Sequence, residues 1–354
     1  MTGKTQYDVA IIGGGLAGLI SAILLARKGH SVVLFERKQY PFHRVCGEYI
    51  SNETVPFLRE NGLFPDGFSP EQIKHFRLTS VSGKSAELLL DLGGFGISRY
   101  VFDNFLYRKA VESGVNVFCN TTVDDVNIKE AKVVIGAFGK RSKLDAQFNK
   151  RRSPYVGVKY HIRIDHPKGL IELHNFKDGY CGISNVEGGV TNLCYLTHSN
   201  NMKEHGNIRR MEEEVLFRNP FIKSIFEKAE FLFEKPEVIS EISFEAKSPV
   251  VDHVLMVGDA AGMITPLCGN GMAMAIRSGL IAARCVENFL DGRITREEME
   301  RSYEVAWRNN FASRLWIGRQ VQRLFGSEWT SDLAAGLPKF LIKQIVKRTH
   351  GDPF

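Results

Sequence analysis

Hydrophobic positions change their period along the chain, and each change predicts a different element. Residues 7–12 (YDVAII) form a short and nearly continuous apolar run, as expected for a strand that is buried on both faces. Three glycines follow, and apolar residues then recur at helical spacing from Leu16 to Ala26. Residues 31–36 (SVVLFE) have the pattern of another buried strand, so the beginning of the chain predicts a βαβ unit with parallel strands.

The middle of the chain has a different pattern. Between Tyr155 and Thr197, four short apolar runs are separated by the turn signals Pro-Lys-Gly, Lys-Asp-Gly and Glu-Gly-Gly, which predicts an antiparallel sheet. Helical spacing follows from Met211 to Phe233, and a second strand, glycine turn and helix begin at His253. Helices are predicted from there to Phe354.

Composition adds limits to this picture. The 354 residues suit one or two globular domains, and 46 basic against 40 acidic residues give a net charge of +6 that is spread along the chain. Such a charge favours steering of anions and predicts no nucleic-acid partner. The six cysteines form no CxxC pair and no metal-ligand spacing, so we expect no metal site and a reducing, cytoplasmic setting. The N-terminal apolar run is too short for a signal or a membrane span.

The glycines at Gly13, Gly15 and Gly18 follow a predicted strand and open a predicted helix, and Glu36 closes the next strand. In this context GxGxxG indicates a dinucleotide site, because Gly13 allows a tight turn, Gly15 admits a diphosphate to the backbone and Gly18 lets helix and strand pack closely. A carboxylate at Glu36 can accept hydrogen bonds from the adenosine ribose and disfavours NADP. The predicted contacts here are Gly13, Gly15, Leu16, Ala17, Gly18, Glu36 and Arg37.

A second glycine-rich turn lies far away in the sequence, at residues 254–279 (VLMVGDAAGMITPLCGNGMAMAIRSG). A nicotinamide enzyme with one site has no need of it, whereas a flavin ring and its ribityl chain extend well past the diphosphate. Asp259 can accept from ribityl hydroxyls, and the predicted helix beginning near Asn270 directs its positive end towards a reduced flavin. The predicted contacts here are Gly258, Asp259, Pro266, Gly269, Asn270, Gly271 and Met272.

The third segment is a predicted helix start at residues 97–106 (ISRYVFDNFL). Arg99 can reach from the cofactor to the substrate. Asp103 has two interpretations: it belongs to the site, or it only complements the helix dipole in the first turn.

Together the three segments resemble the FAD superfamily that contains p-hydroxybenzoate hydroxylases and geranylgeranyl reductases. The resemblance covers most of residues 7 to 290 and implies one non-covalently bound FAD. It implies an α/β fold: a Rossmann-like, GR2-type FAD-binding domain, an antiparallel-sheet substrate domain and a helical C-terminal tail. It also implies cofactor contacts at Arg44, Val45, Cys46, Gly47, Gly136 and Ala137.

The domain boundaries predicted from these patterns are discontinuous. Residues 1–75, 98–145 and 245–295 are assigned to the FAD-binding domain, residues 76–97 and 146–244 to the sheet domain, and residues 296–354 to the C-terminal helices.

The chain departs from the superfamily pattern at Phe138, where an aspartate is usual. In the hydroxylases that aspartate supports FAD and NAD(P)H binding, so the resemblance makes direct reduction by a pyridine nucleotide doubtful. The segment from Arg44 to Tyr49 (RVCGEY) instead resembles the Cys-Gly segment that geranylgeranyl reductases place beside the flavin. Residues 179–182 (GYCG) resemble their isoprenoid-pocket segment, with Cys181 in place of tryptophan.

Three residues are predicted to be catalytic. Cys46 can donate a proton while flavin N5 gives a hydride, although a core thiol is equally compatible with the sequence. Glu48 can act as an acid or base, or it can be a solvated carboxylate. Tyr180 can line the pocket, or it can be an ordinary sheet aromatic.

The predicted function is FAD-dependent reduction of a double bond in a hydrophobic isoprenoid, polyene or aromatic molecule. A flavin monooxygenase is the first alternative and a non-catalytic electron carrier is the second. The predicted partners are that substrate and an electron donor, either NAD(P)H or a reductase protein. The apolar and basic stretch at 311–347 predicts either peripheral membrane contact on the inner face or helices packed on the protein itself.

Overall fold

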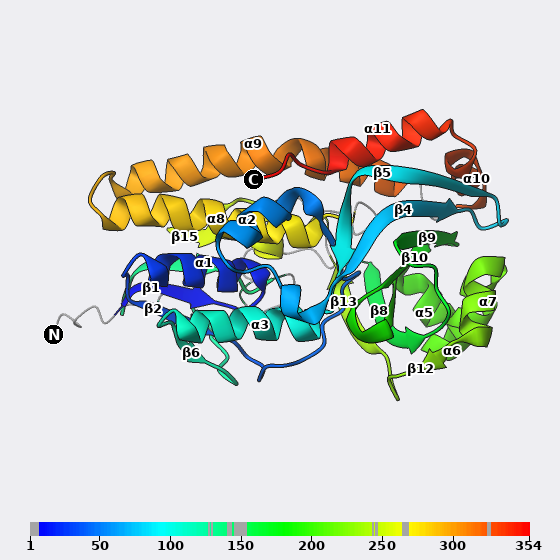
Figure 1. Cartoon of the computed structure of the whole chain (residues 1–354), viewed down its shortest axis with the longest axis horizontal. Coiled ribbons are helices and arrows are strands. Elements are labelled where there is room, and N and C mark those ends of the chain that lie inside the picture. Colours follow the sequence, from blue (N-terminus) through cyan, green and yellow to red (C-terminus); the bar gives the residue numbers. More distant parts are fainter. Residues whose placement is uncertain are drawn as a thin grey trace.

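Two β-sheets lie end to end in the computed structural model (Figure 1). The structure describes residues 7–126, 128, 130–139, 144, 154–242, 244, 247–263, 269–323 and 327–354. The first sheet has the order β14 (Val250–Val251), β15 (Val254–Met256), β7 (Ala131–Gly136), β1 (Tyr7–Ile12), β2 (Val32–Phe35) and β6 (Asn116–Phe118). The second has the order β12 (Glu230–Phe231), β8 (Tyr155–Arg163), β11 (Thr191–His198), β10 (Gly179–Asn185), β9 (Leu170–Phe176), β4 (Glu71–Thr79), β5 (Ser85–Gly96) and β3 (Tyr49–Ser51), with β13 (Glu237–Ile242) also on β8.

The first sheet confirms the predicted βαβ unit. Strand β1 pairs in parallel with β2 on one side and β7 on the other, and β15 pairs in parallel with β7. The carboxyl ends of β1, β7 and β15 therefore meet at one edge of the sheet, where ligands of such folds bind. Since β1 precedes the first glycine turn and β15 precedes the second, this topology brings the two turns together.

The second sheet contains the four antiparallel strands that the turn signals predict. Strands β8, β11, β10 and β9 pair antiparallel in turn, and β9 then pairs in parallel with β4. The sheet also includes β3, and β4 begins at Glu71 rather than at residue 76. Strand β3 precedes α2, so one short segment from the first part of the chain belongs to the second sheet.

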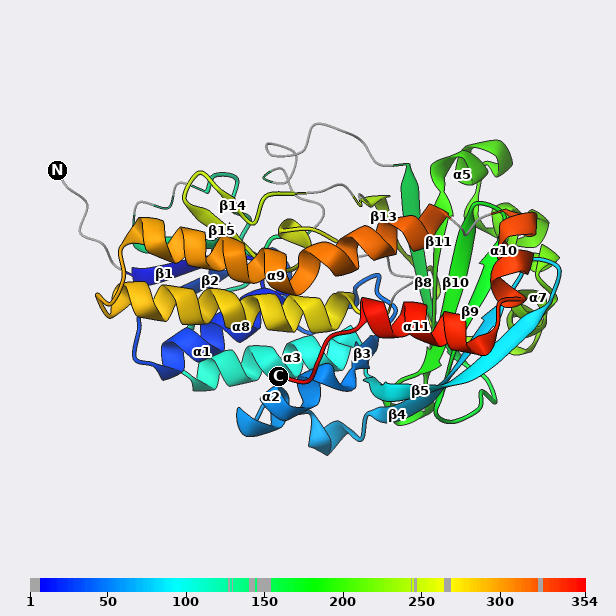
Figure 2. The same cartoon turned by 90° about the horizontal axis from the view of Figure 1, so that it is seen from above.

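The helices form layers on both sheets (Figure 2). On the first sheet, α8 packs on α1, and α9 lies over α8. Helix α11 continues along the same side to β5 of the second sheet. The helices are α1 (Leu16–Arg27), α2 (Val55–Glu60), α3 (Arg99–Glu112), α5 (Ser199–His205), α6 (Ile208–Glu214), α7 (Pro220–Lys228), α8 (Gly271–Leu290), α9 (Arg296–Arg323), α10 (Glu328–Ala335) and α11 (Lys339–Thr349).

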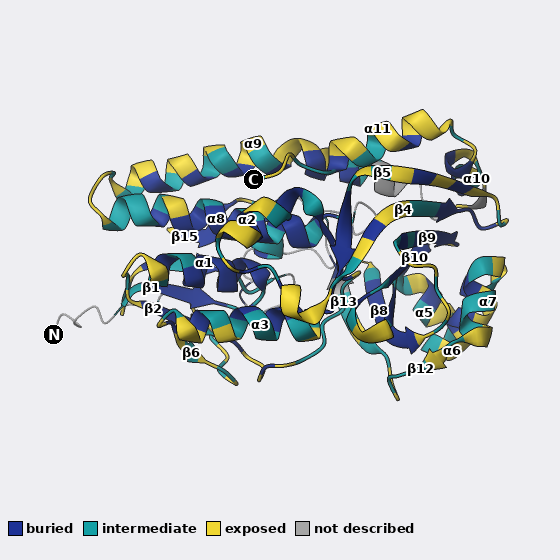
Figure 3. Cartoon of the chain, in the orientation of Figure 1, coloured by how far each residue is buried: buried dark blue, intermediate teal, exposed yellow. Residues whose placement is uncertain are grey.

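Burial follows these layers, with buried strands and with exposed residues on the outer faces of α9 and α11 (Figure 3). Among the helices that the structure describes, none combines the length and the apolar composition needed to cross a bilayer.

The two faces of the second sheet have different surroundings. Because side chains alternate along a strand, Val158, Tyr160 and Ile162 of β8 share one face. They pack there with Met211 and Ile222 under α6 and α7. Residues 157, 159 and 161 of the same strand face the other way, towards the loop that follows β2.

Candidate active site

The first glycine turn is packed tightly at Gly13 and Gly18 but has room at Gly15 among the described residues. A Cβ at Gly13, whose φ is +107°, would lie 2.3 Å from the Ala137 carbonyl oxygen, and one at Gly18 would lie 2.1 Å from the Gly13 carbonyl oxygen. At Gly15 the nearest atom to such a Cβ is a guanidinium nitrogen of Arg99, 3.8 Å away. Gly15 is the N-cap of α1 and provides no side-chain cap, so the amides at this helix start face open space beside a cation.

The second glycine turn lies directly beside the first helix. A Cβ at Gly258 would be 3.2 Å from the Ala17 Cβ, and one at Gly279 would be 2.6 Å from the Ala17 carbonyl oxygen. The Ser21 hydroxyl donates a 3.1 Å hydrogen bond to the Gly279 carbonyl. Small residues thus let α1 and α8 approach closely, and the two turns adjoin as the motifs predict.

Helix α8 begins at this junction without a side-chain cap. Its N-cap residue Asn270 is fully buried, donates from Nδ2 to the Thr349 carbonyl, and has a buried Oδ1 with no hydrogen-bond partner among the residues that the structure describes. Gly269 has φ +63° and lies against the ring of Tyr49. A buried polar atom and uncapped helix amides at one place suit a polar ligand. Met272 is buried in the first turn of α8, and Pro266 lies outside the described residues.

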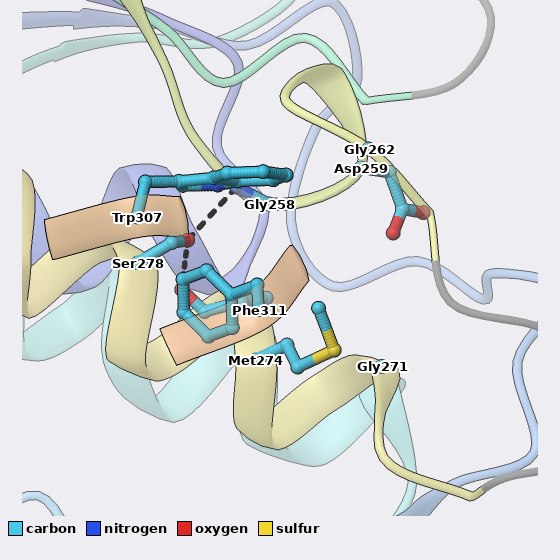
Figure 4. Close-up of a pocket in the computed structure, with 9 residues that line it drawn as sticks. Gly258, Asp259, Gly262, Gly271, Met274, Ser278, Trp307 and Phe311 are labelled. Carbon is cyan, nitrogen blue, oxygen red and sulfur yellow. Dashed lines mark hydrogen bonds between the residues drawn. The ribbon is translucent and has the colours of Figure 1, made fainter. Parts of the chain in front are cut away.

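A small cavity lies behind the Gly258 turn (Figure 4). Trp307 and Phe311 of α9 close it, and the Gly258 amide donates to Ser278 Oγ at 2.9 Å. The Asp259 side chain points away from Trp307 and Ser278. This packing fixes the turn from behind and leaves the Asp259 carboxylate on its other side. The apolar spacing of α9 gave no indication that it supports the site.

A chain of ion pairs runs from the first turn to the start of α3. Glu36 accepts from the Gly14 amide at 3.0 Å and pairs with Arg44 at 3.0 Å. Arg44 also pairs with Asp103 at 2.9 Å, and Asp103 pairs with Arg99 at 2.6 Å. Glu36 and Asp103 are both buried, so the two arginines are held in place from both sides.

Asp103 therefore belongs to the site. The first-turn interpretation is wrong, because α3 begins at Arg99 and has no acidic residue in its first turn, and its N-cap Ser98 accepts from the Val101 amide. Burial opposes the charge of Arg99, but Asp103 and the Cys46 sulfur raise the pKa of Arg99 above its usual value. The guanidinium stays charged and contacts Cys46.

The segment containing Cys46 lies against the second sheet. Cys46 is partly buried, and its carbonyl accepts from Asn192 Nδ2 at 3.1 Å. Glu48 is fully buried and pairs with Lys159 at 2.5 Å and with His161 at 2.7 Å. Cys46 thus lies where the ion-pair chain of the first sheet meets strands β8 and β11.

The environment of Glu48 does not support the predicted acid/base role. Burial by itself would raise its pKa, but the Lys159 charge and the His161 hydrogen bond together lower it from 4.5 to about 2. A carboxyl with this pKa remains ionised near neutrality and has no proton to give. Lys159 and His161 were not singled out from the sequence, although two polar residues at alternate positions in the apolar run YVGVKYHIRI indicate a polar cluster on one strand face.

The lowered pKa of Glu48 predicts a specific loss of stability in acid. Its pKa is lower in the folded chain than in the unfolded chain, so its stabilisation is complete above pH 4.5 and disappears as the pH falls towards 2. Between pH 4.5 and 2 the wild type should therefore lose on the order of 3 kcal/mol of unfolding free energy through Glu48. The Glu48→Gln variant should not show this part of the loss. Urea unfolding of both flavin-free proteins between pH 6 and 2.5 measures it, and equal pH slopes would contradict the interpretation.

Tyr180 and Cys181 point to opposite faces of β10. Tyr180 is buried with Leu78, Leu196 and Met263, on the face towards the second glycine turn. Cys181 is buried on the other face, where burial raises the pKa of its thiol well above the usual value. Tyr180 thus lies on the face towards the second glycine turn, whereas Cys181 points away from that turn.

The remaining predicted contacts surround the same junction. Gly136 ends β7 and Ala137 follows it, and the Ala137 amide donates to the Ile12 carbonyl beside Gly13. Val45 packs 3.0 Å from the Cβ position of Gly157 on β8. Arg37 and Gly47 are exposed, and Leu16 and Ala17 are buried in α1.

Several known proteins resemble this chain in sequence or in fold. The FAD binding domain family matches residues 6–149. Digeranylgeranylglycerophospholipid reductase of Methanocaldococcus jannaschii is 25% identical, over 97% of this chain and 94% of its own length. The myxobacterial chondrochloren halogenase CndH superposes with a TM-score of 0.79 at 19% identity, over 97% of this chain and 90% of its own. A geranylgeranyl bacteriochlorophyll reductase-like protein from Thermoplasma acidophilum superposes with a TM-score of 0.73 at 20% identity, over 99% of this chain and 93% of its own.

These matches confirm the predicted fold class, the predicted cofactor FAD and the resemblance drawn from the three motifs. The solved structures, all distant in sequence, establish the fold alone, which reductases and halogenases share. The choice of reaction therefore depends on the residues of this chain.

Proposed function

We propose that this FAD-dependent oxidoreductase reduces carbon–carbon double bonds in a hydrophobic, isoprenoid-type substrate. The position of Cys46 is the observation that carries the proposal: it contacts Arg99 at the glycine turns, and its backbone is held by Asn192 of the second sheet. The reductase from Methanocaldococcus jannaschii, which resembles the chain over nearly its whole length, supports the same reaction class.

Bound FAD supplies, in its reduced form, the hydride that such a reduction needs. The amides at the starts of α1 and α8 bind the diphosphate and the flavin end, and Arg99 neutralises negative charge between them. The Cys46 thiol gives the proton to the carbon next to the one that receives the hydride, and solvent then restores that proton. The apolar face around Tyr180 and Leu196 excludes water from the substrate chain.

Phe138 is evidence about which molecule donates the electrons. It follows β7 beside Gly13, where its Cα lies 2.9 Å from the Cβ position of that glycine. The aspartate that the hydroxylases have at this place is missing, so we propose that a reductase protein, rather than bound NAD(P)H, supplies the two electrons. Holoprotein that NADH or NADPH reduces at a catalytic rate without another protein would contradict this.

The reaction is tested by product analysis in the absence of oxygen. The holoprotein, reduced with dithionite, is incubated with a digeranylgeranyl glycerophospholipid, and the lipid is examined by mass spectrometry. We expect a gain of two hydrogens for each double bond reduced and no incorporated oxygen. A lipid that stays unchanged without oxygen and becomes hydroxylated when air is admitted would establish the monooxygenase alternative instead.

We further propose that the C-terminal helices contact an anionic membrane surface, from which a lipid substrate is drawn. Large apolar side chains are exposed on successive helices: Trp316 (59%) on α9, Trp329 (76%) and Leu333 (55%) on α10, and Phe340 (64%) on α11. Exposed basic residues Lys339, Lys347 and Arg348 lie on α11. Aromatic residues with nearby cations are typical of protein that lies at a lipid headgroup layer.

Vesicle binding tests this surface. The double variant Trp329→Glu/Phe340→Glu is expected to lose most of its sedimentation with vesicles that contain phosphatidylglycerol, because it places two carboxylates in the proposed contact. Val111→Glu, at a half-exposed apolar position on α3, is the matched control. Equal sedimentation of both variants would place the membrane contact elsewhere or exclude it.

A further inference from the structure

The loop that follows β2 lies along one face of strand β8. Val45 contacts Gly157, Glu48 pairs with Lys159 and His161, and the ring of His43 lies edge-on to that of His161 with the centroids 5.0 Å apart. Positions 157, 159 and 161 alternate along β8 and therefore share a face. The contacts form a continuous junction between the flavin-binding side of the protein and the second sheet.

Glu48 is the most constrained residue of this junction. It has φ +55°, a left-handed conformation that is costly for any residue other than glycine. Its buried carboxylate accepts from Lys159, from His161 and, at 2.7 Å, from the Arg99 amide at the start of α3. This backbone conformation opposes folding, and its presence at a residue with three buried partners points to a role beyond stability.

The strained residue controls the geometry around Cys46. Glu48 follows Cys46 by two residues, its carbonyl accepts from the Ile97 amide, and its side chain holds the first residue of α3. Arg99, at that helix start, lies beside both Gly15 and Cys46. A displacement of Glu48 would therefore move the thiol and the guanidinium together.

Glu48 also completes a charge balance. Together with its contact to the Arg99 amide, the Glu48–Lys159 pair extends the ion-pair chain that begins at Glu36. The extended chain contains equal numbers of cations and anions, namely Arg44, Arg99 and Lys159 against Glu36, Asp103 and Glu48. Charge near the ring sets how readily a flavin accepts electrons. Glu48 and Lys159 should therefore change the stability of the reduced flavin in opposite directions.

We propose that Glu48 is a positioning residue of the flavin site: paired with Lys159 and His161, it fixes the Cys46 segment and the start of α3 against β8 and sets the charge that the flavin meets. The inference rests on the flavin chemistry of the proposed function and requires no particular substrate. A dye-coupled potential titration without substrate therefore tests it separately from double-bond reduction.

The test compares the flavin midpoint potentials of three holoproteins with the wild type. Glu48→Gln removes an anion without changing the side-chain size, and it is expected to raise the potential. Lys159→Met removes a cation while keeping an unbranched stem, and it is expected to lower the potential. The double variant is expected to return towards the wild-type potential, which a loss of packing would not produce.

Glu172 provides the matched control. It is a buried carboxylate of the same sheet, paired with Arg77 at 2.6 Å and with His166 at 3.0 Å, and it has no contact with the loop. Glu172→Gln should lower stability but leave the potential unchanged. Shifts of the same sign in both single variants, no shift in either, or an equal shift in Glu172→Gln would overturn the proposal.

A neutral variant keeps the proposal testable if a charge variant does not fold. Asn192→Ala removes the hydrogen bond to the Cys46 carbonyl and leaves every charge in place. It is expected to increase severalfold the rate at which Cys46 is alkylated in the flavin-free protein, as followed by peptide mass mapping. An unchanged alkylation rate would show that Asn192 of β11 does not hold this segment, which would count against the proposal.

Discussion

Gly15→Val is expected to yield a folded protein that no longer binds FAD. Among the described residues, a Cβ at this position meets only the Arg99 guanidinium, 3.8 Å away, so there is room for the side chain. The same space is where the diphosphate must approach the backbone. We expect the FAD dissociation constant to rise by at least about 100-fold, or about 3 kcal/mol, with little change in the melting temperature of the flavin-free protein. Fluorescence titration with FAD and thermal unfolding measure the two quantities.

Gly18 provides the contrast. A Cβ there would lie 2.1 Å from the Gly13 carbonyl oxygen, so Gly18→Ala should lower stability itself, by about 1–3 kcal/mol as in overpacked cores. Unimpaired FAD binding by Gly15→Val would mean that the first turn is not the diphosphate site.

Asp103→Ala is expected to destabilise the protein by about 3–5 kcal/mol, the usual cost of breaking a buried ion pair. Asp103 is 1% exposed and bonds both Arg44 and Arg99, so its removal leaves two cations facing each other without their shared anion. Urea unfolding measures the loss, and the weakened hold on Arg99 should also reduce FAD affinity.

Asp66 is the control for Asp103. It also pairs with an arginine, Arg59 at 3.2 Å, but both side chains are more than half exposed. Asp66→Ala should change the unfolding free energy by less than about 1 kcal/mol, because exposed pairs contribute little. Similar losses in the two variants would show that Asp103 has no special place in the fold.

The sequence was sufficient to predict the two glycine turns and their meeting. Each turn follows an apolar run, and parallel strands bring their carboxyl ends to one sheet edge, so Gly15 and Gly258 had to lie close together. The four antiparallel strands between Tyr155 and Thr197 were equally predictable, because their turn signals are local in the sequence.

The junction between the two sheets was not predictable in the same way. Asp103 resembles a first-turn acid until α3 is seen to begin at Arg99, and its second partner Arg44 is 59 residues away. Glu48 resembles a surface carboxylate, and its partners Lys159 and His161 are more than 100 residues away. Hydrophobic periodicity says which face a strand buries, but not which distant loop lies on that face.

The position of Cys46 at this junction links the fold to the proposed reaction. The first sheet holds the cofactor, the second supplies the apolar face around Tyr180, and the thiol lies where the two meet. A reductase needs a hydride source, a proton donor and a dry substrate site close to one another, and we propose that this junction supplies all three.

Anaerobic stopped-flow mixing tests this central claim most directly. Holoprotein that has been chemically reduced is mixed with an isoprenoid lipid in the absence of oxygen, and flavin absorbance is followed in the wild type and in Cys46→Ala. The account predicts that the lipid reoxidises the wild-type flavin, and that the variant does so on the order of 100-fold more slowly because its proton donor is missing. Flavin that stays reduced with the lipid and is reoxidised only when air enters would contradict it.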